Sequence, residues 1–203
     1  MNPRNLRLLL LLVFASAINA QDLFPHEVCA PTGNFTGNST YQTTLTTLLS
    51  SISTTNSLSL TYGFFNASAV VSGASQTLYV IGSCRGDLTA ESCRTCLKTS
   101  ASDIRRLCPL QKGAVLYSEN CTVRHSNASI FGTVTTDPDY QLFNVNNVTN
   151  PDTYNAALRA LLDDLRGKAA AGGSLRKYAT GNTSADFDKI YAMVQCTPDL
   201  TEQ

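Results

Sequence analysis

The spacing of hydrophobic residues divides the chain into candidate helices and strands. Apolar side chains recur at helical intervals in residues 39–54 and 90–107, which predicts two helices, each with one buried face. Shorter β-branched and aromatic runs predict strands near Val28 and at 61–65, 77–84, 113–118 and 122–125. Thr89 is a candidate N-cap for the second helix. This order predicts an α+β fold, with an antiparallel sheet and two helices on one side.

The same pattern returns after 112 or 113 residues. The stripe of the first helix is Tyr41, Leu45, Leu48, Leu49 and Ile52, and it recurs at Tyr154, Leu158, Leu161, Leu162 and Leu165. The strand at Tyr79–Ile81 and Cys84 recurs at Tyr191–Met193 and Cys196. Asn150 and Pro151 supply a cap and a first-turn proline for the second copy of the helix. The chain is therefore expected to contain two tandem repeats.

The second repeat is expected to be truncated. The counterpart of Cys93 would lie two residues beyond Gln203, so this repeat has its first helix and the neighbouring strands but no second helix or final strands. We expect a complete domain at 21–135 and a truncated one at 136–203, with a linker around 137–139. The strand at 187–195 would lack a covering helix, which predicts poor order or self-association.

The first residues and the overall charge point to a secreted chain. Residues 1–20 combine two arginines, a short apolar stretch and a small-residue exit, which predicts a secretory signal peptide cleaved after Ala20 or, alternatively, after Ala17. No later apolar run is long enough to span a bilayer. Fifteen Lys and Arg balance fifteen Asp and Glu without a basic cluster, so nothing indicates a nucleic-acid partner. The predicted location is extracellular.

The seven cysteines carry the strongest local signal. Cys84 ends the predicted strand at 77–84, and Cys93 and Cys96 lie on one face of the following helix. Six cysteines in the first repeat allow fifteen pairings. A redox pair at Cys93 and Cys96, or a four-thiolate zinc site with Cys84 and Cys108, are alternatives. An oxidising compartment favours structural disulfides over both.

No catalytic constellation stands out, so we expect a non-enzymatic protein without a cofactor. His26 and His125 stand alone, and no Gly-x-Ser-x-Gly motif or phosphate-binding glycine loop occurs. The carboxylate pairs at 163–164 and 186–188 are more typical of solvated surfaces than of a general acid and base.

The spacing Cys84-x8-Cys93-x2-Cys96 resembles the signature of the ginkbilobin-homologous, or salt-stress-response/antifungal, domain of plant receptor-like kinases and secreted proteins. This resemblance implies the same α+β fold and the pairs Cys29–Cys108, Cys84–Cys93 and Cys96–Cys121. The first pair would close the longest loop, worth roughly 4 kcal/mol in chain entropy. Cys196 would be left unpaired and could link two copies into a homodimer.

In the seed antifungal members, an Asn, an Arg and a Glu bind mannose. The resemblance places these roles on Ala30, Val115 and Ser126, whose side chains lack the required polar groups. Mannose binding by that arrangement is therefore not expected. The hypotheses are a module that contacts a protein or cell-wall saccharide in stress or defence signalling, a directly antifungal protein, and a truncated receptor-kinase product without an independent role.

Asn-x-Ser/Thr sequons are candidate glycosylation sites in a secreted chain. They lie at Asn34, Asn38, Asn66, Asn120, Asn127, Asn147 and Asn182. Asn120 is the least favourable of them because the predicted disulfide residue Cys121 follows it directly.

Overall fold

The structure is a computed structural model that describes residues 25–54, 63–135, 140–172 and 177–200. The predicted signal peptide and the linker at 137–139 lie outside these residues. Repeat one, which ends before that linker, contains β1 His26–Cys29, α2 Thr40–Thr54, β2 Phe64–Val70, β3 Thr77–Cys84, α4 Ala90–Leu107, β4 Ala114–Tyr117 and β5 Cys121–Ser126. Repeat two, which follows the linker, contains α5 Pro151–Ala170, β6 Tyr178–Ala185 and β7 Asp188–Gln195.

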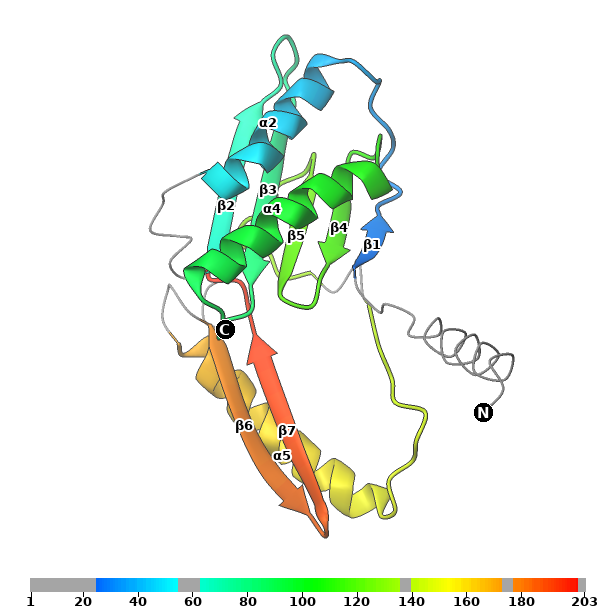
Figure 1. Ribbon diagram of the computed structural model, residues 1–203, viewed down its shortest axis with the longest axis vertical. Coiled ribbons are helices and arrows are strands. Elements are labelled where there is room, and N and C mark those ends of the chain that lie inside the picture. Colours follow the sequence, from blue (N-terminus) through cyan, green and yellow to red (C-terminus); the bar gives the residue numbers. More distant parts are fainter. Residues whose placement is uncertain (1–24, 55–62, 136–139, 173–176, 201–203) are drawn as a thin grey trace, which may run out of the picture.

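Repeat one forms an antiparallel five-stranded sheet in the order β1-β4-β5-β3-β2. Both of its helices lie on the same side of the sheet, as Figure 1 shows, which confirms the predicted α+β arrangement. One strand differs from the prediction: β2 runs from Phe64 to Val70 instead of ending at residue 65, while residues 61 and 62 of the predicted strand lie outside the described residues. Its later residues alternate Ala, Ser and Ala, and this weakly hydrophobic pattern hid a strand that forms by pairing with β3 along its whole length.

The helices begin and pack as their sequences dictate. The Thr89 hydroxyl caps α4 by accepting a hydrogen bond from the backbone N–H of Ser92 at 3.2 Å. Leu49 and Ile52 of α2 and Ile104 of α4 are fully buried in the core between the helices and the sheet. The opposite face of the sheet, which we call the open face, carries no helix of repeat one.

Repeat two is a smaller helix-and-hairpin unit at one end of repeat one (Figure 1). Asn150 caps α5 through its side-chain oxygen and Pro151 occupies the first turn, as predicted. The helix packs on one face of the β6–β7 hairpin around Leu161, Leu165, Ala185 and Ile190. The expectation that the strand would lack a covering helix is therefore wrong, because α5 covers this face, but the other side of the hairpin faces water as expected.

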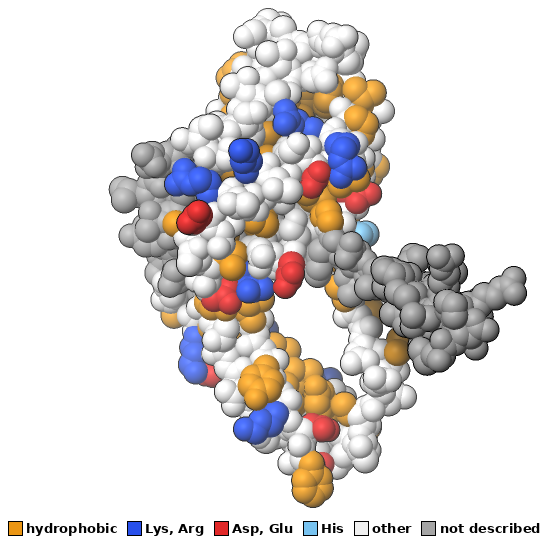
Figure 2. Space-filling model, viewed as in Figure 1, with side chains coloured by type: hydrophobic (Ala, Val, Ile, Leu, Met, Phe, Trp, Pro, Cys, Tyr) orange, Lys and Arg blue, Asp and Glu red, His pale blue; other side chains and the backbone are white. Residues whose placement is uncertain are grey.

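The exposed surface of repeat two lies elsewhere. Leu49 is 0% exposed beside α4, whereas Leu162, its match in repeat two, is 38% exposed because the described residues contain no counterpart of α4. On the face of the hairpin away from α5, Tyr191 is 74% and Met193 48% exposed. Figure 2 shows hydrophobic side chains gathered on this part of the molecule. Repeat two thus has a small core of its own and an apolar surface beside it.

Candidate binding cleft between the repeats

Three disulfides hold repeat one together, and they have the pairing that the family resemblance implies. Cys29–Cys108 joins β1 to the end of α4, Cys84–Cys93 joins β3 to the first turn of α4, and Cys96–Cys121 joins α4 to β5. Cys196 is a free thiol at the end of β7. No cluster of His, Cys, Asp and Glu in the described part of the chain could hold a metal ion.

A cleft of about 500 Å³ lies on the open face of repeat one, where repeat two meets it. The strand register places Val28, Val115, Arg124 and Ile81 in one row across β1, β4, β5 and β3, and the last three line the cleft. The walls come from the segment 130–135 and from the end of β7 up to residue 200. The cleft therefore needs both repeats, and its size falls within the usual range for small-molecule sites.

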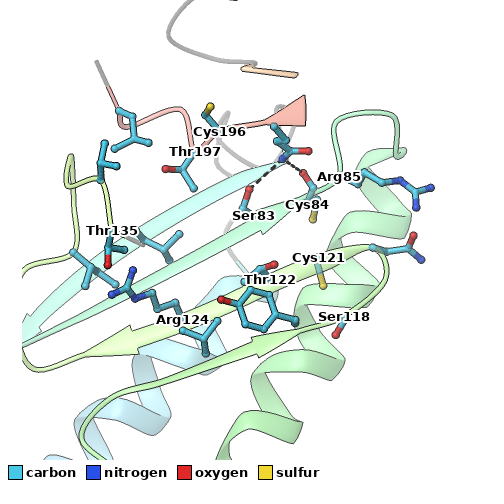
Figure 3. Close-up of a pocket in the computed structure, with 18 of the residues that line it drawn as sticks. Ser83, Cys84, Arg85, Ser118, Cys121, Thr122, Arg124, Thr135, Cys196 and Thr197 are labelled. Atoms are coloured by element: carbon cyan, nitrogen blue, oxygen red, sulfur yellow. Dashed lines mark hydrogen bonds between the residues drawn. The ribbon is translucent and has the colours of Figure 1, made fainter. Parts of the chain in front are cut away.

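The two arginines that line the cleft, Arg85 and Arg124, differ in their partners and in their direction. Arg85 is ion-paired with Asp87 at 2.7 Å, which raises its pKa and lowers that of the Asp87 carboxyl. Figure 3 shows the Arg85 side chain pointing away from the cleft, whereas the Arg124 guanidinium rises from the sheet towards Thr135. Within the described part of the chain, no carboxylate forms an ion pair with Arg124. Arg124 is thus the cation that remains available in the cleft.

Hydrogen bonds from Gln195 fix the junction between the repeats. Its amide nitrogen donates to the Cys84 carbonyl at 2.6 Å and to the Ser83 hydroxyl at 3.3 Å (Figure 3). Its amide oxygen accepts from the Gly86 N–H at 3.0 Å. Gly86 must be a glycine here, because a Cβ would lie 2.7 Å from Cβ of Tyr178. Residue 86 can therefore carry no side chain without moving repeat two.

A second contact fixes the wall of the cleft. The Asp199 carboxylate accepts a hydrogen bond from the Gly132 N–H at 2.7 Å, and it joins the segment after β7 to the segment after β5. Asp199 matches Asp87 in the repeat alignment, so the equivalent carboxylates serve an ion pair in one repeat and an inter-repeat hydrogen bond in the other.

The two histidines lie on opposite faces of the sheet. His26 stacks on Tyr140 of the inter-repeat segment with ring centroids 3.7 Å apart. His125 is buried on the helix side, and desolvation lowers its pKa to about 4, although a hydrogen bond with the backbone of Lys112 acts in the opposite direction. Burial also raises the pKa of Tyr41, whose hydroxyl donates to the Lys112 carbonyl, to about 12.

The carboxylate pairs fit the solvated-surface interpretation. Asp163 and Asp164 pair with Arg166 and Lys168 along the exposed side of α5. Asp186 adopts a positive φ of 51° in the β6–β7 turn, where its carboxylate accepts from the Asn150 amide at 3.3 Å. Neither pair lines the cleft.

The positions matched to mannose binding lie near one another at the edge of the open face. The Ala30 N–H donates to the Gly113 carbonyl at 2.9 Å, Val115 is two residues further along, and Ser126 adjoins His125, the partner of Ala114. Val115 is buried and lines the cleft, whereas the Ser126 hydroxyl accepts from the Ala128 N–H at 3.0 Å. No amide, guanidinium or carboxylate occupies these three positions.

Sequence reasoning missed the residues that build the cleft. Arg124 lies directly opposite Val115, but this pairing depends on strand register, which the pattern alone did not supply. Gln195 and Gly86 meet only because the repeats pack end to end. The sequons are mostly exposed, at Asn34, Asn38, Asn66, Asn147 and Asn182, while Asn120 and Asn127 are half-buried and Asn120 borders the cleft.

The fold and cleft define a class of protein, the disulfide-stabilised α+β module arranged in tandem. The model of the "Salt stress response/antifungal" family matches residues 28–128 and again 142–203. The chain belongs to this family.

Relatives include cysteine-rich receptor-like protein kinase 29 of Arabidopsis thaliana, which is 40% identical over 92% of this chain. The chain spans only 27% of the length of that kinase. Cysteine-rich repeat secretory protein 38 of Arabidopsis thaliana is 32% identical over 93% of this chain, and the match covers 72% of that relative. Antimicrobial ginkbilobin-2-like protein of Castanea crenata is 32% identical over 95% of this chain and 77% of its own.

Among solved structures, the tandem DUF26 ectodomain of the Arabidopsis thaliana cysteine-rich receptor-like protein PDLP8 matches with a TM-score of 0.74. It is 25% identical, and the match covers 89% of this chain and 81% of that one. Across the described residues, none of the helices combines the length and apolar character that a membrane crossing requires.

Proposed function

We propose that this chain is a secreted, non-catalytic binding module that recognises its ligand in the cleft between the repeats. The observation that carries the proposal is Arg124, a cation without an ion-pair partner in the described residues, in a cleft that both repeats build. Convergent polar groups in a cleft of this size are typical of a binding site. The isolated positions of His26 and His125 argue against acid–base catalysis there.

An extracellular location accounts for the cysteines and for the names of the relatives. Three disulfides suit an oxidising compartment, and one relative is called a secretory protein. We therefore propose cleavage of residues 1–20, domains at 21–135 and 136–203, and action in plant stress or defence signalling at the cell surface or in the apoplast. The partner would be a protein or a cell-wall saccharide.

A directly antifungal, carbohydrate-binding protein is the second candidate, favoured by the similarity to the antimicrobial ginkbilobin-2-like protein. The side chains of Ala30, Val115 and Ser126 oppose the mannose-binding form of this function. Calorimetry of the secreted chain against mannose and mannan should show no saturable heat. Saturable mannose binding together with inhibition of fungal growth would favour this candidate instead.

The cleft itself can be tested with a blocking variant. The full chain is probed on an array of cell-wall oligosaccharides and purified receptor ectodomains, and Thr133→Trp is compared with wild type. Thr133 is exposed on the wall of the cleft, whereas Thr47 is exposed on α2 on the other side of the sheet, so Thr47→Trp is the matched control. We expect saturable binding that only Thr133→Trp abolishes. Absence of any saturable ligand, or equal binding by both variants, would contradict the proposal.

We also propose that two copies associate through repeat two with an intermolecular bridge between their Cys196 residues. Cys196 is the free thiol of the described chain. The exposed side chains of Tyr191 and Met193 provide an apolar surface on the hairpin face away from α5. Burying such a surface in a second copy would remove it from water.

A further inference from the structure

Arg124 occupies the middle of the open face with apolar neighbours on both sides. Val115 is its partner on β4 and Ile81 its partner on β3, and neither can accept a hydrogen bond from the guanidinium through its side chain. Among the described residues the structure records no hydrogen bond or ion pair for this side chain. A guanidinium retains a strong demand for acceptors, so a ligand that enters the cleft gains most by presenting a negative group to it.

The remaining charges in the lining do not cancel this demand. Arg85 is already neutralised by Asp87 and points out of the cleft (Figure 3). Glu119 is the only acidic residue among the described lining residues, and it lies in the turn between β4 and β5, beyond Tyr117 and Ser118. The cation in the cleft thus selects for an anion, and the planar fork of arginine matches a carboxylate in particular.

The rest of the lining alternates between hydroxyl groups and apolar surface. Hydroxyls come from the side chains of Ser83, Thr122 and Thr133, and apolar contact comes from Val115, Ile81 and Ile130. Tyr117 adds an aromatic ring. A sugar ring presents the same two characters, with hydroxyls at its rim and C–H groups on its faces.

We propose that the cleft binds a carboxylate-bearing saccharide, a uronate, whose carboxylate pairs with Arg124 while its ring lies over Tyr117 and the hydroxyl side chains. This inference rests on the proposed function and specifies its ligand class. The carboxylate of a uronate is ionised at pH values well above its ordinary pKa. Binding therefore depends on the geometry of Arg124 and on the negative charge of the ligand.

The test is titration calorimetry of the full chain with α-1,4-linked trigalacturonate. Wild type is expected to bind this probe saturably and to show no saturable heat with the neutral galactose trimer. Arg124→Gln should lower the affinity roughly ten- to hundredfold, the effect of losing a charged hydrogen-bond partner. Arg159→Gln is the matched control, because Arg159 is exposed on α5 and has no ion pair in the described part of the chain. It should leave the affinity unchanged.

Two further variants separate the role of Arg124 from a general loss of stability. Arg124→Lys retains the charge but not the fork and should bind with intermediate affinity. Thr133→Trp blocks the cleft from an exposed position, so it tests the site even if Arg124→Gln lowers the Tm. No binding of trigalacturonate by wild type, equal binding of the neutral trimer or of a tri-aspartate peptide, or an equal loss in Arg159→Gln would each overturn the inference. If these occur while Thr133→Trp abolishes binding of another array ligand, the proposed function stands and the uronate assignment falls.

Discussion

The buried His125 ring should make the protein lose stability as the pH falls from 7 to 5. In the folded protein its pKa is about 4, against an ordinary value of 6.5. Its Nδ1 atom is buried without a hydrogen-bond partner among the described residues, so a proton added there finds no acceptor. The neighbouring Tyr41 has a pKa of about 12 and stays neutral throughout this range.

The sign and magnitude follow from proton linkage. Between pH 6.5 and 4 the unfolded chain carries a proton on this imidazole and the folded protein does not, so the unfolded state binds more protons and is favoured as the pH falls. From the two pKa values, His125 alone lowers the free energy of unfolding by about 2 kcal/mol between pH 7 and pH 5. The stabilising effect of the neutral ring is fully present above about pH 7.

Urea unfolding at pH 7, 6 and 5, followed by far-ultraviolet circular dichroism with disulfides intact, measures this change. His125→Phe removes the titration and should flatten the pH dependence by about 2 kcal/mol, whatever its own effect at pH 7. His26→Gln, at the stacked histidine on the other face, is the control and should keep the wild-type dependence. An NMR titration in which His125 protonates near pH 6.5, or equal pH dependence in wild type and His125→Phe, would refute the reasoning.

Two other substitutions test the junction and the free thiol. Gly86→Ala would force a methyl group into Tyr178, and overpacking of this kind typically costs about 1 to 3 kcal/mol. Limited proteolysis between the repeats should therefore accelerate in Gly86→Ala but not in the control Gly167→Ala, because Gly167 has open space around it. Equal proteolysis rates in the two variants would show that the repeats do not pack in this way. Non-reducing gels should show a covalent dimer for wild type and a monomer for Cys196→Ser, and a monomer in both, with Cys196 unreactive under native conditions, would exclude the bridge.

The sequence predicted the fold of repeat one because its local signals agree with one another. The stripe from Tyr41 to Ile52 is buried as a unit, and the cap at Thr89 forms as expected. Strand β2 was misplaced because its Ala and Ser residues carry little strand propensity, and only the partner strand β3 defines it. The candidate site was harder to predict, because Arg124 acquires its role from residues more than forty positions away in β3 and from a second repeat packed end to end.

The end of β3 connects the covalent and non-covalent frameworks of the molecule. Cys84 is bonded through its sulfur to α4 and through its carbonyl to Gln195 of repeat two, and α4 is bonded in turn to β5. A force that separates the repeats would act on disulfide-linked elements in repeat one, but only on a few hydrogen bonds at the junction with repeat two. The joint between the repeats is therefore mechanically weaker than repeat one, and under tension the cleft would open before the disulfide-linked repeat one unravels.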